Sequence, residues 1–187
     1  MNNLVAPILR LHDAVFALIA RAAGSWFLPT LARFAFLAVL FFYFLSSAQT
    51  KVGDGFLGFL NPADSAYYQI ALPAVEAAGG DVANVAFLPW GVIVRLGTWA
   101  EFLLPAMIVL GLFARVAALG MIGFVAVQTL VDITVHKVDA TTIGALFDRF
   151  PDSLIADQRL LWLVPLLILV VHGAGPLSLD RLLAKRR

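Results

Sequence analysis

Four long apolar stretches, almost free of charge, constrain this chain more than any other feature of its sequence. They cover about residues 27–47, 90–113, 115–135 and 155–173. Each approaches the roughly 20 residues that an α-helix needs to cross about 30 Å of hydrocarbon. Only 13% of the residues are charged, against about 25% in an average soluble protein. The sequence therefore predicts an all-α, polytopic membrane protein, with residues 1–187 forming a single domain around a bundle of four transmembrane helices.

Basic residues gather on one side of the predicted bundle. Arg33 lies in the first stretch, Arg115 lies in the short link between the second and third, and a basic tail follows the fourth. With four spans these segments share one side of the membrane, and the positive-inside rule makes that side the cytoplasm. We therefore expect both termini in the cytoplasm and the Asp-rich loops 48–89 and 136–154 on the outer side.

Residues 1–24 carry a different pattern. Apolar residues recur at helical spacing from Leu4 to Ala22, whereas Arg10, Asp13 and Arg21 fall on other faces. This pattern is typical of an amphipathic helix that lies at the membrane interface, here on the cytoplasmic leaflet. A helix packed on the ends of the bundle accounts for the same pattern equally well.

Several polar residues fall inside the apolar stretches, where they are costly and therefore candidates for function. Measured by helical rise from Arg115, Glu101 lies roughly 21 Å toward the outer face, Asp132 roughly 25 Å and His136 roughly 31 Å. Gln128 lies near the depth of Glu101, and Lys51 and Arg95 lie near that of His136. The sequence thus predicts a polar layer in the outer third of the bundle, supplied by three of the four spans.

Within this layer, Gln128, Asp132 and His136 are spaced i, i+4, i+8 and share one helical stripe. We expect Glu101 to meet Gln128 or Asp132, and Arg95 and Lys51 to neutralise the outer acids. One interpretation is an outward-open pocket that binds a small head group or passes protons, and a quinone ring fits such a pocket. Glu101 and Asp132 are then its catalytic acid–base candidates. The proposed ligand-binding residues are Arg95, Gln128, His136, Lys51 and Trp99. The other interpretation is a set of buried ion pairs that only fixes helix register.

Other kinds of site are excluded or unsupported. The chain has no cysteine, which excludes thiol relays and thiolate metal sites. Asp132 and His136 have the spacing of two metal ligands but lack a third, so no metal site is predicted. A net charge of +1 gives no signal for nucleic acid. No nucleophile motif, phosphate loop or dinucleotide fingerprint is present, so quinone is the only cofactor suggested.

Two segments resemble those of a known family. The ending HGAGPLSLDRLL and the stretch RLGTWAEFLLPAMIVLGLFARVAALGM are similar to the corresponding parts of DoxX-type membrane proteins, and Arg33 and Lys51 fit the same pattern. The likeness covers about residues 30–183. It implies a four-helix bundle in the bacterial cytoplasmic membrane, with Glu101 as the acidic residue of the second span. Arg115 then matches the family's link arginine, and Asp180 its terminal aspartate.

The chain departs from the DoxX pattern at two places. Ala174 replaces the central residue of a Gly-Pro-Gly motif, and the polar residue at the start of the fourth span is at best Gln158. The second departure weakens the transfer of a catalytic role.

The resemblance also carries a functional theme, since relatives include the membrane subunits of a thiosulfate:quinone oxidoreductase. We predict a subunit of a membrane redox system that binds quinone or a similar lipid-soluble carrier in the outer polar layer. Electrons would come from a partner protein, because the chain has no cofactor motif of its own. A non-catalytic scaffold that anchors a partner stays open as an alternative. A small transporter is disfavoured, because four spans without inverted repeats leave little room for alternating access unless the chain oligomerises.

Overall fold

The computed structural model describes residues 2–53, 55 and 58–185. Four of its helical segments are long and apolar enough to cross a membrane: Phe27–Gln49, Phe87–Leu110, Ala114–Thr134 and Leu154–His172. The predicted ends differ from these by at most three residues. No β-strand occurs among the described residues, where only an isolated bridge joins Val52 to Pro62. The predicted fold class, an all-α membrane protein with four spans, is confirmed.

The spans are not uniform α-helices. The first runs through α2 (Phe27–Ala35), the π-helical segment η1 (Phe36–Phe41) and α3 (Phe42–Gln49). The second begins with the π-helical turn η4 (Phe87–Gly91) and continues as α6 (Val92–Leu110), and the third is α7 (Ala114–Thr134). The fourth begins with η5 (Leu154–Arg159), also π-helical, and continues as α9 (Leu160–His172). A π-helical turn rotates everything after it relative to a regular α-helix, which affects where side chains point.

The link between α6 and α7 is as tight as its sequence predicts. Gly111 ends α6 in the left-handed conformation (φ +66°), which glycine adopts without steric cost. A Cβ atom at this position would also lie 2.6 Å from the side chain of Ser178 and 3.1 Å from the guanidinium carbon of Arg33. Gly111 therefore provides both the turn and the close approach of the C-terminal segment.

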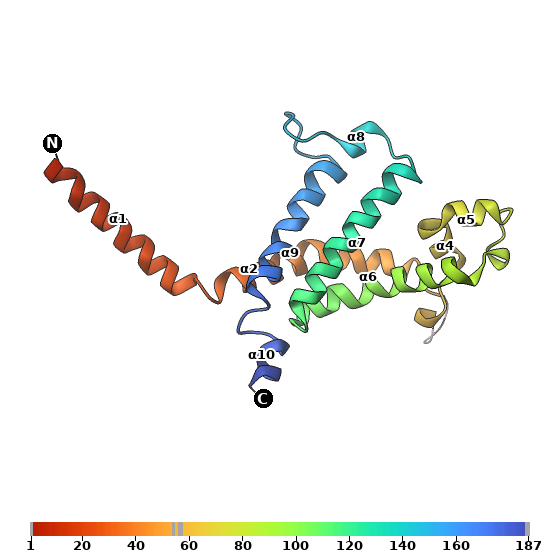
Figure 1. Cartoon of the computed structure of the whole chain (residues 1–187), viewed down its shortest axis with the longest axis horizontal. Helices are drawn as coiled ribbons and strands as arrows, with labels where there is room; N and C mark the ends of the chain where they lie inside the picture. The colour runs from red at the N-terminus through yellow and green to blue at the C-terminus, as the bar shows by residue number, and fades with distance from the viewer. Residues whose placement is uncertain (1, 54, 56–57, 186–187) are drawn as a thin grey trace.

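The four spans pack closely at the end of the bundle that carries both termini, which we call the terminal end. Their shared core contains Phe36, Phe44, Met121, Leu166 and Leu169, all fully buried or nearly so. Toward the opposite end, which we call the loop end, the spans separate into two pairs. α3 stays beside α6, and α7 stays beside α9 (Figure 1).

The outward faces of the spans are strongly apolar. The outward-facing side chains are at least 59% exposed in five examples: Phe34, Val39, Leu103, Val116 and Leu161. In water such a surface would be unfavourable, whereas lipid tails are as apolar as these side chains. The four spans and their exposed faces together indicate a multi-pass membrane protein.

Short helices cover the loop end. In the loop between the first and second spans, η2 (Gly58–Leu60) is followed by α4 (Asp64–Ile70), α5 (Leu72–Ala77) and η3 (Val82–Asn84). Ala66 and Ala71 from this loop pack against Val94 of α6 and hold the loop on the second span. The loop between the third and fourth spans contains α8 (Ala140–Ile143), whose first turn is capped by the Asp139 carboxylate. Hydrogen bonds from the side chains of Thr141 and Thr142, then from their backbone N–H groups, hold the pKa of Asp139 well below its usual range.

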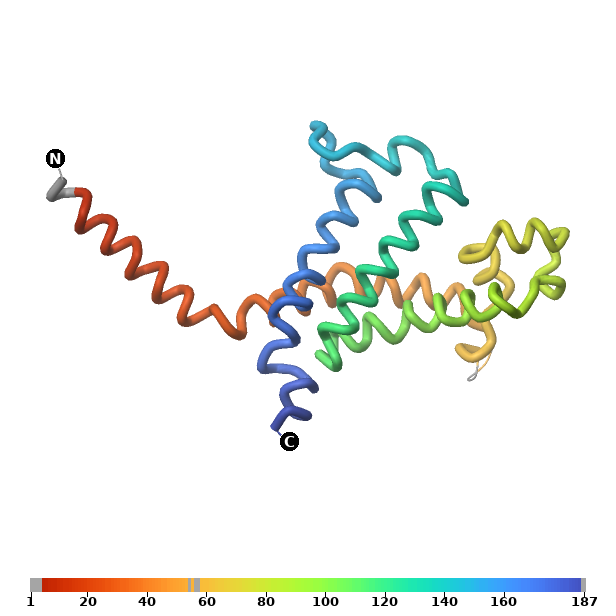
Figure 2. Tube along the Cα trace, in the orientation of Figure 1, coloured from red at the N-terminus to blue at the C-terminus, as the bar shows by residue number. Residues whose placement is uncertain are grey.

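The N-terminal helix α1 (Asn2–Ala23) is present as predicted. It stands clear of the bundle, to which only the turn before α2 joins it, as the trace in Figure 2 shows. Its apolar side chains, Ile8, Leu11, Val15 and Leu18 among them, are exposed. The alternative of a helix packed on the bundle ends is therefore wrong for this structure. The chain closes with α10 (Leu179–Ala184) at the terminal end.

Candidate functional site

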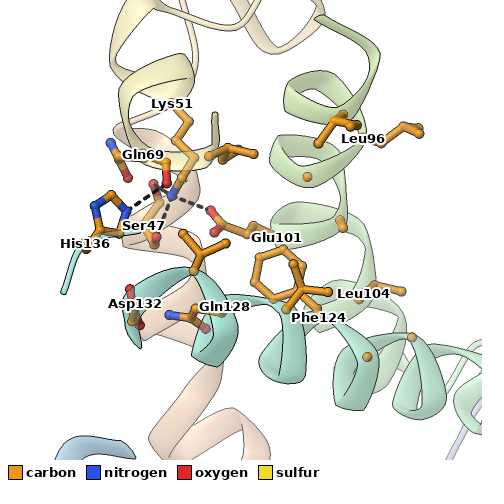
Figure 3. Close-up of a pocket in the computed structure, with 18 residues that line it drawn as sticks. Ser47, Lys51, Gln69, Leu96, Glu101, Leu104, Phe124, Gln128, Asp132 and His136 are labelled. Atoms are coloured by element: carbon orange, nitrogen blue, oxygen red, sulfur yellow. Dashed lines mark hydrogen bonds and ion pairs between the residues drawn. The ribbon is translucent and has the colours of Figure 1, made fainter. Parts of the chain in front are cut away.

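A cavity of about 480 Å³ opens between the two pairs of spans in the loop-end half of the bundle. Its wall comes from the end of α3, from α4, from α6 and from α7 (Figure 3). Five residues of the predicted polar layer line it: Lys51, Glu101, Gln128, Asp132 and His136. These five residues, which helical rise places at similar depths, therefore do share one cavity. Depth can be estimated in this way because the rise per residue changes little along a span.

A buried ion pair crosses the cavity wall between the first and second spans. Nζ of Lys51 lies 2.9 Å from Oε2 of Glu101, and the two residues are only 4% and 6% exposed. The same ammonium also donates to the hydroxyl of Ser47 at 2.7 Å and to the Ser47 carbonyl at 3.2 Å. All three protons of Lys51 therefore have partners within the protein.

The prediction that Glu101 meets Gln128 or Asp132 is wrong about the partner. Glu101 pairs with Lys51 instead. Lys51 is one of the two cations that the sequence analysis expects to neutralise acids of the polar layer. An ammonium compensates a buried carboxylate, whereas an amide compensates it less and a second carboxylate would repel it.

Asp132 has a partner that the sequence reasoning missed, Arg159 in η5. A guanidinium Nη of Arg159 donates to Oδ2 of Asp132 in a very short contact, and the other Nη donates to the hydroxyl of Thr129 at 2.7 Å. Arg159 is 8% exposed and lies 6.0 Å from the ring of Trp162. The sequence does hold the signal, because Arg159 falls one turn inside the predicted span 155–173, at the depth where Asp132 sits on the neighbouring span.

Arg95 and Trp99, two of the predicted ligand-binding residues, do not line the cavity. Arg95 donates to the Gly91 carbonyl at 3.2 Å and to the Tyr67 hydroxyl at 3.4 Å, and it lies over the Phe87 ring. The indole N–H of Trp99 donates to the Phe59 carbonyl at 2.7 Å. The reason is angular: Arg95 and Trp99 are four residues apart and share a face of α6, whereas the face of Glu101 is more than 100° away.

Trp99 instead lines a separate hollow of about 440 Å³. The other residues around this hollow are Phe59, Leu60, Phe102 and Leu103, all of them apolar.

Gln128 and His136 complete the polar side of the cavity. The Gln128 amide nitrogen donates to the Tyr43 hydroxyl at 3.2 Å, while its Oε1 is buried without a hydrogen-bond partner among the described residues. Nε2 of His136 lies 3.1 Å from the Gln69 carbonyl oxygen. A carbonyl oxygen can only accept, so Nε2 carries the proton and Nδ1 of the neutral ring is an acceptor.

The remaining charged candidates lie at the terminal end, where they form hydrogen bonds with backbone groups. Arg33 donates to the carbonyl oxygens of Ile108 and Ala174, each at 3.2 Å, and to those of Val109 and Leu177 in shorter contacts. Asp180 accepts from the backbone N–H groups of Phe113 and Ala114 at 2.7 and 3.0 Å. Arg115 donates to the carbonyl oxygen of Val171 at 3.2 Å. Each charge satisfies backbone groups that a helix end leaves open, so these contacts are structural.

The chemistry of the cavity is that of a small polar site with an apolar wall. Leu104, Phe124 and Val127 supply the wall, and the exposed side chains of Leu96 and Val127 stand on the rim between α6 and α7. In the part of the chain that the structure describes, no group of three or more His, Asp or Glu residues is arranged to hold a metal ion.

Comparisons of the chain with protein-family models, with curated proteins and with solved structures find no match. The resemblance to DoxX-type proteins therefore stays a prediction that rests on residues of this chain alone.

Proposed function

We propose that this protein is an integral subunit of a redox system in a bacterial inner membrane, and that its cavity binds quinone or a similar lipid-soluble carrier. In this proposal the chain is of DoxX type and its terminal end faces the cytoplasm. Electrons reach the bound carrier from a partner protein. The observation that carries the proposal is a cavity of ligand size, placed between two spans, with buried charges on one side and apolar side chains on the other.

The burial of charge supports a binding site over a purely structural cluster. Ionisable groups inside a membrane are expensive, and a buried ion pair adds little stability over apolar residues of the same volume. Two ion pairs inside the bundle, Lys51–Glu101 and Arg159–Asp132, both reach the same cavity through Lys51, Glu101 and Asp132. Placing both pairs at one cavity suits a ligand that carries polar groups.

The size and opening of the cavity favour a lipid-soluble ligand. Pockets for small ligands span about 300–1,000 Å³, and this one measures about 480 Å³. Its rim between α6 and α7 is apolar and belongs to the surface that lipid would cover. A carrier dissolved in the bilayer can therefore enter from the side, with its ring against Leu104 and Phe124 and its tail in lipid.

Gly123 offers a direct test, because it lines the cavity and a Cβ atom placed on it would meet nothing within 4 Å. Gly123→Leu should fill the cavity without disturbing the packing of α7. Ala126→Leu, on the exposed face of the same helix, adds a similar volume outside the cavity and is the matched control. Glu101→Gln removes the buried carboxylate, with the exposed Glu76→Gln as its control.

The experiment is to purify the five proteins gently, equilibrate them with decylubiquinone in nanodiscs and measure retained quinone by extraction and mass spectrometry. We expect near-stoichiometric retention by the wild type and both controls, and loss in Gly123→Leu and Glu101→Gln. A wild type that retains no quinone, or a Gly123→Leu variant that retains as much as Ala126→Leu, contradicts the proposal.

A scaffold is the second candidate function, and one observation favours it. Phe147, in the second outer loop, is fully exposed, and Leu146 and Phe150 beside it are more than half exposed. An apolar loop of this kind suits contact with another protein. If Phe147→Ser abolishes co-purification of a partner protein while Glu101→Gln leaves it unchanged, the scaffold is the better interpretation.

A further inference from the structure

The two redox forms of a quinone differ in hydrogen bonding, because the oxidised form only accepts whereas the hydroxyl groups of the reduced form also donate. We infer that the cavity binds the reduced form, the hydroquinone, more tightly than the oxidised form. This inference rests on the proposed function. Its basis is that Lys51, the cation that lines the cavity, already has partners for all three protons, whereas acceptors on α7 and just beyond its end are open.

The charged donor that lines the cavity is already fully hydrogen-bonded. Lys51 is the cation that lines the cavity, and its three protons go to the two oxygens of Ser47 and to Glu101. Arg159 is not among the residues that line the cavity; its two Nη groups donate to Thr129 and Asp132, and its buried Nε has no partner among the described residues. A quinone carbonyl, which can only accept, would therefore have to break an existing bond to obtain a charged donor.

The acceptors that line the cavity are Gln128 and Asp132 on α7 and His136 just beyond its end. Oε1 of Gln128 has no hydrogen-bond partner in the part of the chain that the structure describes. Asp132 uses Oδ2 for Arg159, and Oδ1 takes part in no hydrogen bond within residues 2–53, 55 and 58–185. His136 directs its protonated Nε2 at the Gln69 carbonyl, which leaves Nδ1 as an acceptor. Figure 3 shows these three side chains together on one side of the cavity, opposite Glu101.

The spacing of these acceptors suits a hydroquinone. Gln128 and Asp132 are one turn apart on α7, which is about 6 Å along the helix, and His136 follows just beyond its end. One turn is close to the distance between the two oxygens on opposite sides of a quinone ring. The two hydroxyl groups of a hydroquinone donate, so each can satisfy one acceptor. The carbonyl oxygens of the oxidised form would instead place lone pairs against lone pairs.

The expected preference is at least about tenfold, which is the effect of one hydrogen bond of ordinary strength. The redox midpoint potential of a bound quinone measures it directly. Tighter binding of the reduced form moves the midpoint of the bound couple to a more positive value, by about 30 mV for each factor of ten in a two-electron couple.

The experiment is a potential titration of decylubiquinone in nanodiscs with and without an excess of wild-type protein, at one pH, followed by the absorbance of the quinone. A positive shift of about 30 mV or more supports the inference. A shift of zero or a negative shift overturns the inference and leaves the proposed function standing. If neither redox form binds, as measured by retention in the same nanodiscs, the inference and the proposed function both fail.

Two variants assign the preference to the stripe. Gln128→Leu and His136→Leu each remove an acceptor and should reduce the positive shift, while the affinity for the oxidised form stays the same or rises. Gln49→Leu makes the same change at an exposed position of α3 and should keep the wild-type shift. Equal shifts in all three variants would contradict the assignment of the preference to α7.

Discussion

Removing one partner of the Lys51–Glu101 pair should destabilise the protein strongly, whereas removing both should not. The two charges are 2.9 Å apart, and their side chains are 5% and 7% exposed. At an effective dielectric constant of 20, Coulomb's law gives an attraction of about 6 kcal/mol at that distance. That attraction compensates the desolvation of the two ions. A single truncation leaves the other ion buried and uncompensated, which typically costs about 3–5 kcal/mol.

We therefore expect Lys51→Met to lower the free energy of unfolding by about 3–5 kcal/mol. Glu101→Leu should do the same, because it leaves the ammonium with only the Ser47 oxygens. The double variant Lys51→Met/Glu101→Leu should lie within about 1 kcal/mol of the wild type, since apolar residues of similar volume replace a buried pair at little cost. Glu101→Gln should cost less than Glu101→Leu, because the amide oxygen still accepts from Lys51.

The assay is reversible unfolding by sodium dodecyl sulfate in mixed micelles, followed by circular dichroism, for the wild type, the two single variants and the double variant. The exposed Glu76→Gln serves as the control for a change of net charge. A double variant as unstable as the sum of the two single variants would refute the pairing argument. Single variants within about 1 kcal/mol of the wild type would show instead that the pair is well solvated.

Three further predictions address other parts of the molecule. Asp180→Ala should destabilise the fold by about 0.5–2 kcal/mol, the usual cost of losing a helix cap. The cause is that the backbone N–H groups of Phe113 and Ala114 lose their acceptor, and thermal unfolding measures the effect. The chain has no cysteine, so single cysteines report its orientation cleanly: Phe147→Cys should react with an impermeant maleimide in intact spheroplasts, and Ala184→Cys only after lysis. Asp139 should titrate below the ordinary range of an aspartate in a carboxyl-carbon NMR titration. Because its folded pKa is depressed by the Thr141 and Thr142 hydrogen bonds, its capping of α8 is fully present above the unfolded pKa and is lost only as pH falls through the folded one.

The spans and the depth of the polar layer follow from the sequence because both depend on quantities that hardly vary. The length of an apolar stretch reflects the thickness of the bilayer, and the rise per residue is nearly constant along a helix. The depths of Glu101 and Gln128 were fixed relative to each other by a short link that forces α6 and α7 into a hairpin. That is why both reach one cavity.

The pairing of the charges does not follow from the sequence, because it depends on rotation about each helix axis. The π-helical segment Phe36–Phe41 lies between Arg33 and Lys51, and it turns Lys51 relative to the direction that a regular helix would give. A second π-helical segment, Leu154–Arg159, brings Arg159 against Asp132. Angular estimates from a straight helix fail beyond such π-helical segments, whereas depth estimates tolerate them. On the regular helix α6 the angle does hold: the face that carries Arg95 is directed at Tyr67, in the loop between the first and second spans, and not at the cavity.

The two ends of the bundle use their charges differently, and this separates stability from binding. At the terminal end, Arg33, Arg115 and Asp180 hydrogen-bond to backbone groups, which are fixed in place and hold the four spans together. At the loop end, Lys51 and Glu101 contact each other through side chains that border a cavity. A ligand in the cavity can make further contacts with side chains such as these. The backbone groups at the terminal end already have hydrogen-bond partners and cannot bind it. Substitutions at the terminal end should therefore change the stability of the fold with little change in quinone retention, whereas Gly123→Leu, which fills the cavity without touching the ion pair, should reduce retention with little change in stability.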